Sequence, residues 1–303
     1  MKLTLEDINL EDIDWFYKSS TRGENDSINK IRENIIEHIL TIPNDYKRDN
    51  IYGHKWLSIE KGIKNKIYEC YNLETGRKHK KMAFTIEQKA GRIYRYDFLI
   101  TFKDGTEIKV EFKYSTCMND YPEFLSLPLN KYPLFTSESF IKNWYDNYLE
   151  SYVNSLNINI EEIPPYTEYL NNLNDIKYRH PFFDRVHTAI RSLGRAKMTM
   201  EYNKIHHKAI EEYFNFKRQE ENTLNLTELQ IQMNTQDKYF LFCSEGIFNI
   251  EKIIDHMILT EDYIFTKNQI IITTTTGAQI KCLLRWKNGN GCSLPGWQIS
   301  LKH

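Results

Sequence analysis

The sequence predicts an α/β fold whose core is a helix, a three-stranded β-meander, a second helix and a closing strand, with a helical insertion and a C-terminal β-hairpin. Two observations lead to this class. Apolar residues recur at helical spacing in segments 27–40 and 137–156, and apolar and polar residues alternate between residues 82 and 114. The 303 residues, 41% of them hydrophobic, are enough for one elaborated domain or two with a sizeable core.

The first predicted helix begins at Ser27, whose hydroxyl is suited to cap a helix N-terminus, and it ends before Pro43. A meander is expected next, with strands over residues 82–88, 92–102 and 106–114. Glycine-containing turns at Ala90-Gly91 and Lys103-Asp104-Gly105 separate these strands.

The second predicted helix, 137–156, carries an aromatic stripe that is typical of a face packed into a core: Phe140, Trp144, Tyr148 and Tyr152. A helical segment opened by Pro164-Pro165 follows, then a short apolar strand over 239–243 and a hairpin around Gly277. We therefore expect a core region over 1–156, a basic helical insertion over 157–235, and a region with the closing strand and hairpin over 236–303.

Composition predicts neither a membrane anchor nor a disulfide framework. No apolar run approaches the roughly 20 residues that span a bilayer, and the N-terminus is acidic without an apolar stretch. The five cysteines are odd in number, widely spread and lack a C-x-x-C pair, so a zinc ribbon is not indicated either. An intracellular, cytoplasmic protein is expected, with a nuclear or virus-associated setting left open.

The turn between the second and third strands decides which side chains face each other. A two-residue turn, Asp104-Gly105, would set Asp97 opposite Phe112, on the apolar side. A three-residue turn with Gly105 in a left-handed conformation sets Asp97 opposite Glu111. The second register keeps the apolar residues on one face and the charged residues on the other, so we prefer it.

In this register Asp97, Glu111 and Lys113 share one face of the sheet. Two facing carboxylates repel each other unless a cation lies between them, and hard oxygen ligands suit Mg²⁺ or Mn²⁺. Lys113 is placed to hold a water molecule or to stabilise charge on a pentacoordinate phosphate. Such a set of groups is typical of a metal-dependent phosphodiesterase.

Asp97 followed by Glu111-Phe112-Lys113 within apolar strands resembles the signature of the PD-(D/E)xK, or restriction-endonuclease-like, nuclease superfamily. The resemblance covers about residues 25–156 and the later strand. It implies a restriction-endonuclease-like core in which Asp97 and Glu111 bind Mg²⁺ or Mn²⁺ and Lys113 assists the attacking water. It also implies that a glutamate of the first helix, here Glu33, joins the catalytic site. Tyr96 departs from the proline that is typical of the signature, and the insertion before the closing strand is long.

Two basic segments are candidates for binding nucleic acid, although the net charge is only −1. Arginines and lysines on successive helical turns can follow a phosphate backbone, and basic residues beside tryptophans on a glycine-rich hairpin can enter a groove or stack on a base. The candidates are Arg179, Arg185, Arg191, Arg195 and Lys197 in the helical segment, and Arg285 and Lys287 in the hairpin. A solvated helix face and an ordinary turn are the alternatives.

The sequence therefore predicts a Mg²⁺-dependent endonuclease that hydrolyses DNA, with double-stranded DNA as its partner and a restriction-type enzyme or a homodimer as options. A nuclease for RNA or branched DNA would use the same chemistry. A nucleic-acid-binding protein without catalysis is a further alternative. So is a carbohydrate hydrolase with Asp97 and Glu111 as its acid/base pair, although Lys113 has no role there.

Overall fold

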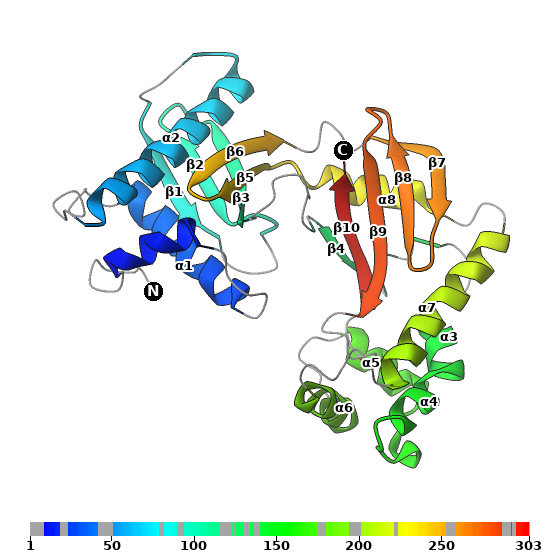
Figure 1. Ribbon diagram of the computed structural model, residues 1–303. Helices are drawn as coiled ribbons and strands as arrows, with labels where there is room; N and C mark the ends of the chain where they lie inside the picture. Colours follow the sequence, from blue (N-terminus) through cyan, green and yellow to red (C-terminus); the bar gives the residue numbers. More distant parts are fainter. Residues whose placement is uncertain are drawn as a thin grey trace. The chain divides into compact units, whose positions relative to one another are not determined.

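The chain folds into two compact units. The computed structural model describes residues 9–18, 24–41, 51–78, 82–89, 94–114, 123, 125–129, 132, 134–135, 140–174, 180–193, 201–220, 224–252, 258–286, 292 and 295–302. Unit 1 consists of Met1–Asp120 and Gln236–Asp255, and unit 2 of Tyr121–Thr235 and His256–His303. Each unit has a five-stranded sheet and its own helices (Figure 1), so the fold is mixed α/β as expected.

Unit 1 is a sheet covered on one face by helices (Figure 1). Its helices are η2 (Leu10–Phe16), α1 (Asn25–Thr41) and α2 (Gly53–Thr75). Its strands are β1 (Phe84–Gln88), β2 (Phe98–Phe102), β3 (Glu107–Tyr114), β5 (Tyr239–Ser244) and β6 (Ile247–Lys252), in the spatial order β1-β2-β3-β5-β6. Only the β3–β5 pair is parallel, so the strand expected over 239–243 joins the meander beside β3.

The core of unit 1 lies between α1, α2 and one face of this sheet. Strand alternation turns Phe98 and Ile100 of β2 and Val110 of β3 to that face, where they are buried. The covering helices bury isoleucines at helical spacing, among them Ile35 of α1 and Ile63 of α2. The opposite face of β3 is thereby left for its charged residues.

The β2–β3 turn has the predicted three-residue form. The strands pair Phe98 with Val110 and Ile100 with Ile108, and Phe102 N–H donates to the carbonyl of Thr106 at 2.9 Å. Gly105 has φ +87°, a conformation that favours glycine. Continuing the register by one pair sets Asp97 opposite Glu111, which confirms the register that we expected.

Unit 2 is built on a second, antiparallel sheet in the order β4-β10-β9-β8-β7. Its strands are β4 (Leu125–Pro128), β7 (Leu259–Phe265), β8 (Gln269–Thr274), β9 (Gln279–Trp286) and β10 (Pro295–Lys302). Its helices are α3 (Phe140–Asn147), α4 (Leu149–Asn154), η4 (Ile160–Glu162), α5 (Tyr166–Asn174), α6 (Pro181–Ser192), α7 (Glu201–Gln219) and α8 (Leu226–Asn234). The expected hairpin is the β8–β9 pair, with Gly277 at φ +83° in its turn.

The observed division of the chain differs from the one expected at residue 156. The predicted helix over 137–156 is two helices, α3 and α4, and both belong to unit 2. Phe140, Trp144 and Tyr152 of the aromatic stripe are buried, and Tyr148 is partly exposed. The stripe packs against the second sheet, because the rings of Phe140 and Trp144 lie 5.9 and 5.2 Å from that of Trp286. The second helix that covers the sheet of unit 1 is α2, which precedes the meander. Residues 236–303 are likewise shared between the two units.

The described cysteines, Cys70, Cys243, Cys282 and Cys292, are buried. Among the described helices, none combines the length and the hydropathy that a bilayer span requires.

The β5–β6 turn provides a test of the packing in unit 1. Gly246 has φ +78°, and a Cβ added there would lie 2.4 Å from the ring of Tyr17, whereas one added at Gly105 would meet nothing within 4 Å. Gly105→Ala should therefore cost about 1 kcal/mol of unfolding free energy from backbone strain alone. Gly246→Ala should cost a further 1–3 kcal/mol, roughly, through overpacking. Urea unfolding of both variants measures the difference, and equal losses would mean that Tyr17 moves aside without cost.

Candidate active site

Four of the residues singled out in the sequence come together in unit 1, at the end of β2 that is remote from the Gly105 turn. Asp97 immediately precedes β2, Glu111 and Lys113 lie on β3, and Glu33 lies on α1. Electrostatic interactions link Glu33 to Asp97 and Lys113, and link Asp97 to Glu111. The four side chains therefore form a single cluster.

Asp97 extends the pairing between β2 and β3 by one residue beyond Phe98. Its backbone N–H donates to the carbonyl of Val110 at 3.0 Å, and its Oδ2 accepts a hydrogen bond from the backbone N–H of Phe112 at 2.8 Å. A carboxylate oxygen thus satisfies a strand N–H just before β2 begins. This hydrogen bond fixes the Asp97 carboxyl group beside β3.

Glu111 is held between two lysines. Lys113 Nζ forms an ion pair with Oε1 of Glu111, and Lys238 Nζ forms one with Oε2. The side chain of Glu111 is only 12% exposed and that of Lys238 only 3%, so this is a largely desolvated charge cluster. Such groups are stable only when they are paired, and removal of one partner leaves a buried charge uncompensated.

Lys238 is a site residue that the sequence analysis did not identify. It directly precedes β5, and the parallel pairing of Val110 with Tyr239 brings it beside the charged face of β3. Its ammonium also donates to the backbone carbonyl of Arg95. A lysine next to an apolar strand was the only local signal, since the pairing of β5 with β3 is not visible in the sequence.

Glu33 extends the cluster from α1. Its Oε2 accepts a hydrogen bond from Gln88 Nε2, at the end of β1, at 3.5 Å. Burial and the negative charge of Asp97 raise the pKa of Glu33 to about 7, and Lys113 opposes the shift. Glu33 is therefore a carboxyl group that exchanges its proton near neutral pH.

The pKa shifts of Asp97 and Lys238 also arise from burial and from neighbouring charges. Burial, followed by the charge of Glu111, raises the pKa of Asp97, while the Phe112 N–H, Lys113 and Lys238 counteract the rise. Burial also lowers the pKa of Lys238, and Glu111 opposes that shift. Perturbed groups of both signs at one sheet end are typical of a functional site, although structural ion pairs produce them as well.

The oxygen donors of Asp97, Glu111 and Glu33 suit a hard divalent cation such as Mg²⁺ or Mn²⁺. Burial and neighbouring carboxylates raise the pKa values of Asp97 and Glu33. A bound divalent ion would supply positive charge that stabilises their ionised forms. Both oxygens of Glu111 are engaged by lysines, and the described residues contain no ready arrangement of three or more His, Cys, Asp or Glu ligands. The donor set therefore fits a metal, provided that Glu111 exchanges a lysine for it.

The basic candidates lie in unit 2 and differ in their surroundings. Arg185, on α6, forms an ion pair with Glu162, and Arg285 Nη2, on β9, lies 3.4 Å from Glu123. Arg191 is exposed in the last turn of α6, and no ion-pair partner for it is found among the described residues. The remaining candidates, Arg179, Arg195, Lys197 and Lys287, lie outside the described residues.

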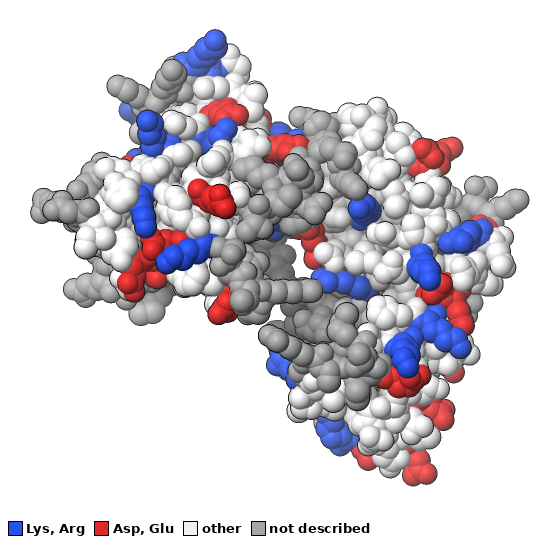
Figure 2. Space-filling view, in the orientation of Figure 1, with Lys and Arg blue, Asp and Glu red and all other residues white. Residues whose placement is uncertain are grey.

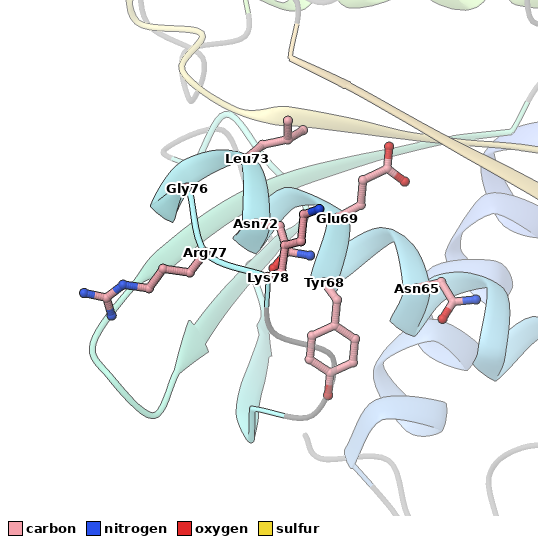
Figure 3. A pocket seen from close by; sticks show the side chains of 8 residues that line it. All are labelled: Asn65, Tyr68, Glu69, Asn72, Leu73, Gly76, Arg77 and Lys78. Carbon is pink, nitrogen blue, oxygen red and sulfur yellow. The ribbon is translucent and has the colours of Figure 1, made fainter.

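The surface charge is mixed in sign. On the face shown in Figure 2, the described basic and acidic side chains are interspersed, in agreement with the net charge of −1. A surface hollow along the C-terminal half of α2 (Figure 3) is lined by Arg77 and Lys78 together with Glu69. This part of α2 lies near the β2–β3 turn, because Tyr71 donates to Asp104, so the hollow is not part of the carboxylate cluster.

Comparisons with known proteins give little further guidance. No protein-family model matches the chain, and no curated protein matches it. Among solved structures, the chain is similar to a crystal structure of the restriction endonuclease MspI in complex with its cognate DNA. The identity is 13%, the TM-score is 0.29, and the match covers 84% of this chain and 85% of that chain. Because so low a TM-score does not establish a common fold, we infer the function from the residues of this chain alone.

The raised pKa of Glu33 predicts a pH-dependent stability difference. A carboxyl group whose pKa rises on folding stabilises the protein below its unfolded pKa, near 4.5, and this contribution is lost as the pH rises through about 7. Glu33→Gln should therefore match the wild type near pH 4 and be more stable at pH 8, by on the order of 1–2 kcal/mol after allowance for solvent screening.

Urea unfolding at pH 4 and pH 8 tests this expectation. Glu37→Gln, one turn further along α1, controls for the substitution itself. A Glu33→Gln variant that is less stable than the wild type at pH 8 would show that the Glu33 charge is stabilised by its surroundings rather than strained.

Proposed function

We propose that this protein is a divalent-metal-dependent endonuclease that hydrolyses phosphodiester bonds in DNA. The observation that carries the proposal is the convergence of Glu33, Asp97, Glu111 and Lys113 at one end of the β2–β3 pair. Carboxylate oxygens that can hold a divalent ion, beside an ammonium group, are suited to metal-assisted phosphodiester hydrolysis. The same residues carry the resemblance to the PD-(D/E)xK superfamily.

In this proposal Asp97 and Glu111 hold Mg²⁺ or Mn²⁺, with Glu33 as the third oxygen donor of the cluster. When bound, the ion supplies Lewis-acid activation of a water molecule and of the phosphate. Lys113, whose side chain is 26% exposed, would donate to the attacking water or to a non-bridging phosphate oxygen.

Double-stranded DNA is the proposed substrate, and unit 2 is proposed to hold it. Exposed arginines on helices bind phosphates without regard to sequence, whereas arginines on a hairpin read base edges. Arg191 is the candidate for the first role and Arg285 for the second. An RNA or branched-DNA substrate would leave the chemistry at Asp97 and Glu111 unchanged, so substrate choice is tested separately from cleavage.

The metal-ligand assignment is tested by plasmid cleavage. Asp97→Asn and Glu111→Gln should each lower the rate at least about 100-fold in Mg²⁺ or Mn²⁺, because each removes a ligand charge. Lys113→Ala should be similarly impaired, and EDTA should abolish cleavage by the wild type. Glu107→Gln, at an exposed position of the same strand, is the matched control and should cleave normally.

Folding of each variant is checked by circular dichroism, and DNA binding by fluorescence polarisation without metal. Undiminished cleavage in EDTA, or by either carboxylate variant, would contradict the proposal. Loss of metal-dependent cleavage with DNA binding retained is the expected result.

The contribution of α6 to DNA binding is tested by substituting its arginines. Arg191→Ala should weaken binding to all duplexes and reduce the slope of log affinity against log salt by roughly one unit per lost phosphate contact. Arg185→Ala is the matched comparison on the same helix and should have the smaller effect, because Glu162 already neutralises Arg185. Polarisation titrations of a labelled duplex at several salt concentrations measure both slopes. If neither slope changes, α6 is a solvated surface.

A further inference from the structure

Lys238 is the most enclosed charge in the carboxylate cluster. Its side chain is 3% exposed, its ammonium contacts Oε2 of Glu111 and the carbonyl of Arg95, and it lies 5.1 Å from the ring centroid of Phe240. Lys113, which occupies the other oxygen of Glu111, is 26% exposed. The two lysines on Glu111 are therefore not equivalent.

The backbone around Lys238 is fixed by contacts of its neighbours. Asp237 forms an ion pair with Lys252 at 2.9 Å, and the hydroxyl of Tyr239 donates a hydrogen bond to Glu74 at 2.9 Å. Lys238 N–H closes a turn onto the carbonyl of Gln236 at 2.9 Å. Since Tyr239 faces the core of unit 1, strand alternation directs Lys238 to the opposite face, where Glu111 lies.

Displacing Lys113 from Glu111 costs less free energy than displacing Lys238. Lys113 can leave Oε1 and remain in contact with water, because its side chain is partly exposed. Lys238 is almost fully buried, and moving it would leave a buried ammonium and a buried carboxylate oxygen unpaired together. A metal ion that binds Glu111 therefore takes the Oε1 side, and Oε2 stays with Lys238.

Two-metal phosphodiesterase sites place their ions about 3.5–4 Å apart and bridge them with shared carboxylates. Glu111, with one oxygen committed to Lys238, lacks the second oxygen for such a bridge, and Oδ2 of Asp97 is engaged by the backbone N–H of Phe112. We propose that Lys238 is a permanent internal cation of this site, which occupies Oε2 of Glu111 and limits the site to one divalent ion. This inference rests on the proposed function, because it presupposes that Asp97 and Glu111 bind a metal.

The number of ions bound tests the inference without any measurement of activity. Isothermal titration of the DNA-free protein with Mn²⁺ should give one ion per chain for the wild type. Lys238→Met keeps the length of the apolar side chain but removes the charge, so it should bind a second ion or bind the first at least about tenfold more tightly. Lys109→Met, at an exposed position of β3, is the control and should behave as the wild type.

Each result has a distinct meaning. Two ions per wild-type chain would overturn the inference and leave the proposed function standing. Unchanged stoichiometry and affinity in Lys238→Met would overturn it too, since the lysine charge would then not compete with metal. No Mn²⁺ binding by the wild type would overturn both the inference and the proposed function. If Lys238→Met does not fold, Lys238→Gln, which retains a donor for the Arg95 carbonyl, replaces it in the same comparison.

Discussion

The register of the β2–β3 pair is the constraint on which the rest of unit 1 depends. One residue, Gly105, supplies the positive φ that makes the turn three residues long. A slip of one residue would move every side chain of β3 to the other face, which would bury Glu111 and Lys113 against α1 and α2 and expose Val110 and Phe112. The hydrophobic core and the charged cluster are thus two results of one turn conformation.

Concentrating charge at the end of β2 opposes the stability of the fold. Burial raises the pKa values of Glu33 and Asp97, and the charge of Asp97 adds to the rise at Glu33 as the charge of Glu111 does at Asp97. Two lysines and the Phe112 N–H make the arrangement tolerable. Folded proteins retain such strained clusters mainly where the strain serves binding or catalysis, because apolar residues of similar size would be more stable there.

Local sequence patterns predict most of the elements of unit 1, but not the pairing of β5 with β3 that completes its sheet. The meander, its register and the convergence of Asp97 with Glu111 could be predicted because the residues that determine them lie within about twenty positions of one another. The helix α2 could also have been predicted, because Trp56, Ile59, Ile63 and Ile67 recur at helical spacing. Lys238 could not be found in this way, since only the parallel pairing of β5 with β3 brings it to the site. The aromatic stripe of α3 and α4 identified a buried face correctly, but periodicity does not specify which sheet covers that face.

The interrupted path of the chain through unit 1 sets an order of assembly during synthesis on the ribosome. The first three strands are translated early, while β5 and β6 appear only after Tyr121–Thr235, which belongs to unit 2. Until then β3 is an open sheet edge, and Glu111 lacks Lys238. Closure of the sheet is a non-local pairing, which is the slow kind in folding. A nascent chain therefore carries the carboxylates of the site and Lys113 well before it carries Lys238, the second lysine on Glu111, and unit 1 becomes complete only after Gln236–Asp255 has been made.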